Sequence, residues 1–133
     1  MDKVSIIVRT CGRPEVLRGA LESIRKQTYP DVETVVIEDG LEISRQMICT
    51  EYSDLQLRYI STGKRVGRAK AGNLGMKVAQ GKYLNFLDDD DVLYPEHIEI
   101  LLQTLQSAEE KAVYSVAEEA ATIYRKRKRT FYD

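Results

Sequence analysis

The chain has 133 residues, of which 43% are hydrophobic and 31% are charged. This length and composition suit one globular domain with a buried core and argue against a disordered chain. The net charge is −1, but a basic block at 125–129 leaves the rest of the chain clearly acidic, which argues against nucleic acid as the main partner.

The sequence gives no sign of secretion or membrane insertion. Cys11 and Cys49 are too few for a disulfide framework, and the apolar stretch at the N-terminus is too short for a signal peptide. No segment is apolar over enough residues to span a bilayer. We therefore expect a cytoplasmic protein without a membrane span.

Apolar, β-branched runs alternate with helix-period segments along the chain. The runs at Val4–Val8 and Glu33–Asp39 predict strands buried on both faces. Leu55–Thr62 predicts a strand nearer the edge of the sheet, and Lys82–Leu87 predicts a fourth strand. A fifth strand is expected within Lys111–Tyr124.

Helical patterns fill the intervals between these strands. One begins at Pro14, a shorter one covers Ile43–Glu51, a third covers Arg68–Ala79 before Gly81, and Pro95 opens the last. This alternation predicts an α/β fold with a mainly parallel sheet and helices on both faces.

Ligands of open α/β sheets bind outside the carboxyl ends of the strands. The residues that follow the four expected strands are polar or glycine-rich: Arg9–Arg13, Glu38–Gly40, Gly63–Arg68 and Asp88–Asp91. They mix basic with acidic groups. This mixture indicates a site for a phosphorylated ligand accompanied by a metal ion.

Four adjacent carboxylates, Asp88 to Asp91, follow the fourth expected strand, and something must offset their repulsion. In an extended segment, Asp88 and Asp90 point to one side, and Asp89 and Asp91 to the other. Two carboxylates on one side can share Mg²⁺ or Mn²⁺, with phosphate oxygens and water completing the shell. Helix capping is the alternative, and it accounts for Asp91 but not for all four.

Taken together, the motifs resemble family 2 glycosyltransferases, which have the GT-A fold, and this resemblance implies a Rossmann-like nucleotide-binding domain. The segments that carry the resemblance are VSIIVRTCGRPEVLRGALESIRKQTYPDVETVVIEDG and VGRAKAGNLGMKVAQGKYLNFLDDDDVLYPEHIE. They match the family's motifs in order. The resemblance implies a donor-binding domain that takes a nucleotide sugar, with a UDP-sugar as the expected donor and Mn²⁺ or Mg²⁺ as the cofactor, for hexosyl transfer in polysaccharide synthesis.

The resemblance also assigns roles to individual residues. The expected nucleotide-sugar-binding residues are Thr10, Arg13, Asp39, Lys70, Asn73, Asp88 and Asp89, and the expected metal ligands are Asp90, Asp88 and Asp91. By the same resemblance, Asp39 accepts a hydrogen bond from uracil N3–H, which would distinguish uracil from bases that present a different edge. No residue is assigned as the catalytic base.

The chain departs from the family pattern at several positions. Arg9 stands where the family has a proline, and Cys11 and Gly12 replace an aromatic residue and an asparagine. Lys70 replaces an arginine, so a point charge stands in place of a bidentate fork. These departures bear on donor preference more than on the fold.

Few residues follow Asp91, whereas inverting members of the family take their base from a second, acceptor-binding half. We therefore interpret residues 1–133 as a single, truncated donor-binding domain that binds donor but transfers sugar poorly. The alternative is a non-catalytic nucleotide-binding or interaction module. The last expected strand offers an edge for a second copy of the chain or for a missing C-terminal domain.

Overall fold

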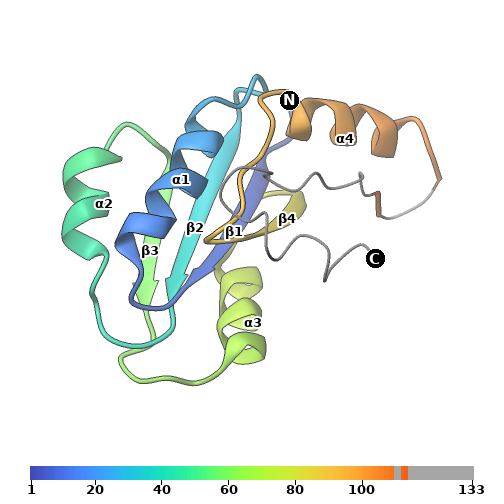
Figure 1. The fold of residues 1–133 in the computed structure, drawn as a ribbon. Coiled ribbons are helices and arrows are strands. Elements are labelled where there is room, and N and C mark those ends of the chain that lie inside the picture. Colours follow the sequence, from blue (N-terminus) through green and yellow to red (C-terminus); the bar gives the residue numbers. More distant parts are fainter. Residues whose placement is uncertain (110–111, 114–133) are drawn as a thin grey trace, which may run out of the picture. The chain divides into compact units, whose positions relative to one another are not determined.

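The computed structural model describes residues 1–109 and 112–113 (Figure 1). In these residues strands and helices alternate in the order β1 (Val4–Thr10), α1 (Pro14–Arg25), β2 (Val32–Glu38), α2 (Arg45–Glu51), β3 (Leu57–Ser61), α3 (Arg68–Val78), β4 (Tyr83–Asp88) and α4 (His97–Gln106). The predicted α/β alternation is confirmed over this range. The fifth strand, which is predicted within Lys111–Tyr124, lies outside the described residues except at 112–113. The pairing of its edge with a second copy or a further domain therefore stays a prediction.

The chain divides into two compact units, Met1–Ile100 and Leu101–Asp133. The first contains the whole described sheet and every candidate site residue. The interpretation of residues 1–133 as a single domain stays a prediction. Among the described helices, none combines the length and the apolar character that crossing a bilayer requires.

The four described strands are all parallel and lie in the order β3-β2-β1-β4. The chain therefore moves outward from β1 to β2 and β3, and then returns to the other side of β1 for β4. This reversal puts the topological switch point between β1 and β4, where open α/β sheets bind their ligands. The register there pairs Arg9 with Asp88.

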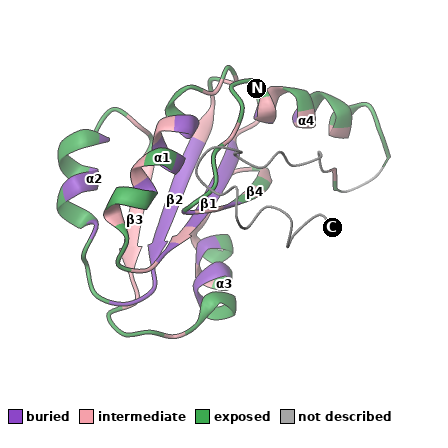
Figure 2. Ribbon diagram, in the orientation of Figure 1, coloured by how far each residue is buried: buried purple, intermediate pink, exposed green. Residues whose placement is uncertain are grey.

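One face of the sheet packs against α3. Ile7, Val35 and Ile37 are fully buried there together with Ala71 of the helix. Gly75 lets the helix come this close, because a Cβ at that position would lie 2.4 Å from Cγ2 of Ile7. The central strands β1 and β2 are accordingly the most buried elements in Figure 2.

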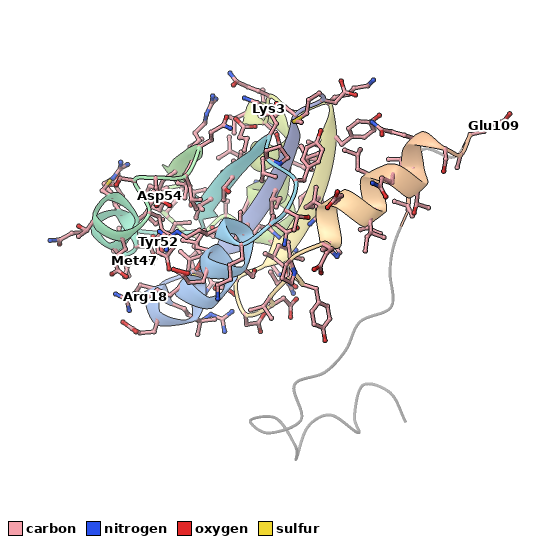
Figure 3. The ribbon with its side chains drawn as sticks, turned by 90° about the horizontal axis from the view of Figure 1, so that it is seen from above. Lys3, Arg18, Met47, Tyr52, Asp54 and Glu109 are labelled. Carbon is pink, nitrogen blue, oxygen red and sulfur yellow. The ribbon has the colours of Figure 1, made fainter. Side chains whose placement is uncertain are left out.

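The opposite face is covered by α1 and α2 (Figure 1). The apolar stripe of α1 is buried, as its periodicity predicts, through Leu17, Ala20, Leu21 and Ile24. The Tyr52 hydroxyl, directly after α2, donates a hydrogen bond of 3.3 Å to the carbonyl of Arg18 in α1 (Figure 3). Helices therefore lie on both faces, which confirms the prediction.

Gly81 does not cap α3, contrary to the sequence-based expectation. The helix ends at Val78, and the next residue, Ala79, is already extended. A Cβ on Gly81 would lie 2.6 Å from the backbone nitrogen of Ser5, so this glycine allows the chain to pass close to β1. The last helix also begins later than expected, at His97 instead of Pro95.

We expect Gly75→Ala to lower the free energy of unfolding. The added methyl group must displace Ile7, and such overpacking costs about 1–3 kcal/mol. The higher helix propensity of alanine stabilises the helix by at most about 1 kcal/mol. Gly19→Ala is the matched control, because its nearest neighbour across space, Val92 Cγ1, is 3.9 Å away. Urea unfolding of both variants checks this, and equal stabilisation by the two alanines would contradict the close packing of α3.

Candidate functional site

The acidic run forms a tight turn at the end of β4. The strand ends at Asp88, and the N–H of Asp91 donates a hydrogen bond of 3.1 Å to the carbonyl of Asp88. One carboxylate oxygen from each of Asp88, Asp90 and Asp91 lies within 4.8 Å of the other two. This group of three carboxylates, called here the acidic cluster, has the all-oxygen ligand set and the spacing that suit a hard divalent cation.

The geometry of the turn corrects one sequence-based expectation. Asp88 and Asp90 do share a side, but Asp91 joins them instead of lying opposite. The strict alternation of a strand holds only as far as Asp88, because the chain turns immediately afterwards. Partial desolvation and then the charges of Asp90 and the other aspartates raise the pKa of Asp91, as expected for crowded carboxylates.

Asp89 points away from the acidic cluster and is only 3% exposed. Its carboxylate accepts a hydrogen bond of 2.9 Å from the Thr10 hydroxyl, and the guanidinium of Arg13 donates to both of its oxygens. The hydrogen bond to Asp89 raises the pKa of Arg13. Three residues predicted to bind the nucleotide therefore come together, but they bind one another and fix the loop after β1 to the turn after β4.

Asp39 holds the loop that leads into α3. Its carboxylate accepts hydrogen bonds from the N–H of Val66 at 2.7 Å and the N–H of Gly67 at 3.1 Å, and from the Thr62 hydroxyl at 3.3 Å. Gly67 has a φ of 99°, a conformation that favours glycine, and the next residue begins α3. The hydrogen bond from Val66 is the largest of the effects that lower the pKa of Asp39.

Lys70 and Asn73 lie on α3 with exposed side chains, close to the helix start that Asp39 fixes. An exposed ammonium and an exposed amide near the carboxyl edge of the sheet are suited to polar contacts with a nucleotide. All predicted site residues therefore lie at the carboxyl ends of β1 and β4, in the loops and the turn that follow the strands, or in the first two turns of α3.

Glu38 is a buried residue of this edge to which the sequence analysis gave no role. Its side chain is fully buried and accepts hydrogen bonds from the N–H of Gly12 at 3.0 Å and the N–H of Ser44 at 2.8 Å. The Tyr59 hydroxyl donates to it as well, and burial followed by this hydrogen bond raises the pKa of Tyr59. The sequence did contain a signal for this role, because a glutamate within a run predicted to be buried on both faces needs hydrogen-bond donors around it.

Comparison with known sequences identifies a family for this chain. The model of the family described as Glycosyl transferase family 2 matches residues 5–131. Glycosyltransferase GlyG of Streptococcus pneumoniae is 30% identical over 114 residues, which cover 84% of this chain and 38% of GlyG. The chain spans less than half the length of the curated relatives it matches, from 15% to 40% among the most similar ones.

Solved structures show the same fold. S. aureus TarS 1–349 in complex with UDP-GlcNAc has a TM-score of 0.72 at 23% identity, covering 85% of this chain and 37% of that one. The mannosyltransferase PcManGT from Pyrobaculum calidifontis, in complex with GDP-Man and Mn²⁺, has a TM-score of 0.76 at 21% identity, covering 93% and 38%. These similarities confirm the GT-A fold.

We expect Asp39→Asn to destabilise the protein at neutral pH by about 1.5–3 kcal/mol, because a buried charged acceptor is replaced by an amide whose NH₂ faces backbone N–H donors. The folded pKa of Asp39 is lowered, so its contribution is complete above the unfolded pKa of about 3.9 and is lost as pH falls through the folded value. Urea unfolding of the parent and of Asp39→Asn at several pH values between 3 and 7 measures this loss of stability.

Asp54→Asn is the matched control for that substitution. Asp54 is also a carboxylate with a lowered pKa, here because of a hydrogen bond from Arg25, but its side chain is 57% exposed. Water screens such a pair, so its removal should cost less. If Asp39→Asn and Asp54→Asn lower the free energy of unfolding equally, Asp39 is not an internal support of the loop that leads into α3.

We expect Asp91→Asn to raise the melting temperature in metal-free buffer at pH 7. The folded pKa of Asp91 is raised, so the charged carboxylate disfavours the fold, and this penalty develops as pH rises above the unfolded value of about 3.9. Glu42→Gln is the control, because Arg45 lowers the pKa of Glu42 and its removal should not stabilise the fold. A lower melting temperature for Asp91→Asn than for the parent would show that the charge of Asp91 is not destabilised by burial and by the neighbouring aspartates.

Proposed function

The chain belongs to glycosyl transferase family 2, and on this basis we propose that it is the donor-binding part of a glycosyltransferase. Its donor is a nucleoside-diphosphate sugar, with UDP as the nucleotide. A divalent cation, Mn²⁺ or Mg²⁺, binds together with the donor.

The observation that supports this function most directly is the acidic cluster at the switch point between β1 and β4. A divalent cation held by Asp88, Asp90 and Asp91 would stabilise charge that develops on the leaving nucleotide. The fit of the residues is good, since the cluster is open to solvent and offers only oxygen ligands. The solved complex of PcManGT, which contains GDP-Man and Mn²⁺, supports the same combination of nucleotide sugar and metal.

The remaining edge residues position the nucleotide. Asp89 fixes Thr10 and Arg13 at the end of β1, so this loop presents a defined surface beside the acidic cluster. Lys70 supplies a positive charge from α3, and Asn73 supplies an amide. A preformed surface of this kind favours binding, because little conformational entropy is lost when the donor arrives.

Asp39 is the residue through which the chain would select uracil. A carboxylate has about four lone-pair directions, and the contacts with Val66, Gly67 and Thr62 use at most three of them. At least one direction is left to accept the N3–H of uracil. Cytosine has an acceptor at that position, so the same carboxylate would disfavour CDP. TarS, which was solved in complex with UDP-GlcNAc and with UDP, supports uridine as the nucleoside.

We expect calorimetry to show metal-dependent binding of UDP, with weaker binding of CDP because cytosine lacks the N3–H donor. Asp90→Asn should reduce the affinity for UDP in Mn²⁺ by at least about tenfold, a loss of about 1.4 kcal/mol, because it removes one ligand of the cation. Asp54→Asn is the matched control, since it removes an exposed carboxylate that lies outside the acidic cluster.

Two results would contradict this function. Equal affinity for UDP in Mn²⁺ and in EDTA would show that the acidic cluster does not bring a cation to the diphosphate. Equal affinities for UDP and CDP would show that Asp39 does not read the base.

A further inference from the structure

Arg9 occupies a defined place beside the acidic cluster. It lies at the end of β1 on the face covered by α3, because it follows Ile7 by two residues in the strand. Its Nη2 donates a hydrogen bond of 3.1 Å to Oδ1 of Asp88, and its Nη1 donates one of 3.3 Å to the carbonyl of Arg68. The guanidinium carbon also lies 6.0 Å from the centroid of the Phe86 ring.

The helix leaves room for this side chain. Gly72 of α3 faces Arg9, and a Cβ at that position would lie 3.6 Å from Cδ of Arg9 and 3.8 Å from its Nη1. Arg9 therefore packs beside the backbone of α3 and near the ring of Phe86. A guanidinium has five N–H donors, and these two hydrogen bonds use only two of them.

Arg9 and a divalent cation would compete for the same carboxylate. Asp88 belongs to the acidic cluster, and a guanidinium 3.1 Å from its Oδ1 occupies one lone pair of that oxygen and places a positive charge beside the position of the cation. The side chains of Arg9 and Asp88 are 27% and 42% exposed, so water weakens their attraction. A cation that gains three carboxylates at once is the stronger partner of Asp88.

We propose that Arg9 is the counter-ion of Asp88 in the metal-free protein, and that it turns to the diphosphate of the donor when the cation takes Asp88. This inference rests on the proposed function. The planar fork of arginine matches two oxygens of a phosphate group, which makes it a better ligand for a diphosphate than a lysine would be. The Arg68 carbonyl and Phe86 keep the released guanidinium beside the acidic cluster.

Arg68 is less suited to this role. Its Nη2 lies 3.8 Å from Oδ2 of Asp88, but its side chain is 77% exposed. A long, exposed side chain loses more rotamer freedom when it is fixed on a ligand. Arg9 is already held in place, so the free-energy cost of ordering it is smaller.

The exchange makes the binding of cation and donor cooperative. The cation releases Arg9 for the diphosphate, and the diphosphate removes Arg9 as a competitor of the cation. Without Arg9, the cation should bind more tightly when alone, whereas the donor should bind more weakly. Opposite changes of this kind are not expected of a residue that only supports the fold.

Calorimetry on the full chain tests the proposal with MnCl₂ alone and then with UDP at saturating MnCl₂. We expect Arg9→Gln to bind Mn²⁺ about two- to fivefold more tightly than the parent, as loss of a partly exposed ion pair allows. We expect it to bind UDP about tenfold more weakly or worse, as loss of a charge-assisted hydrogen bond implies. Arg25→Gln is the matched control, because Arg25 also pairs with a carboxylate, Asp54, and stacks on a ring, Tyr52.

Arg9→Lys provides a second test that keeps the charge. It should bind Mn²⁺ like the parent, and it should bind UDP more weakly than the parent because the fork is lost. Weaker binding of Mn²⁺ to Arg9→Gln, or unchanged affinity for UDP, would overturn the proposal. A parent that binds Mn²⁺ but no nucleoside diphosphate would instead refute the proposed function, and the role of Arg9 at the diphosphate with it.

Discussion

A carboxylate that is removed from water costs the fold several kcal/mol unless hydrogen bonds satisfy its lone pairs. The carboxyl edge of this sheet contains three such groups, Glu38, Asp39 and Asp89, each no more than 6% exposed. Glu38 and Asp89 both take donors from the loop after β1, and Glu38 takes another from Ser44 after β2. Asp39 takes its donors from the loop after β3. The loops after β1, β2 and β3 are therefore fixed by the need to satisfy these buried charges.

The exposed carboxylates of the same edge are left for a ligand. Asp88, Asp90 and Asp91 lie close together at the place where the order of the four described strands reverses, and there Arg9 offsets part of their charge. Buried acidic groups hold the framework, and exposed ones form the opening in which a cation fits. This division explains how adjacent aspartates, one buried and three in a cluster, coexist in one turn.

The sequence was sufficient to predict the order of the elements, because the β-branched runs and the apolar stripe of α1 have distinct periods. It also predicted that Asp88 and Asp90 share a side. It did not predict the position of Asp91 or the contact between Asp89 and Arg13, because both depend on a turn whose geometry adjacent like charges do not reveal. The close approach of Gly75 to Ile7 depends on tertiary packing, which periodicity alone does not encode.

A crystal structure of the chain grown with MnCl₂ and UDP, with the metal located by its anomalous scattering, tests the central claim most directly. The account predicts one manganese ion bound by Asp88, Asp90 and Asp91 and by the diphosphate, with the guanidinium of Arg9 no longer on Asp88. It also predicts that Asp89 keeps its contacts with Thr10 and Arg13. Manganese at another place, or UDP bound while Arg9 still pairs with Asp88, would contradict the account.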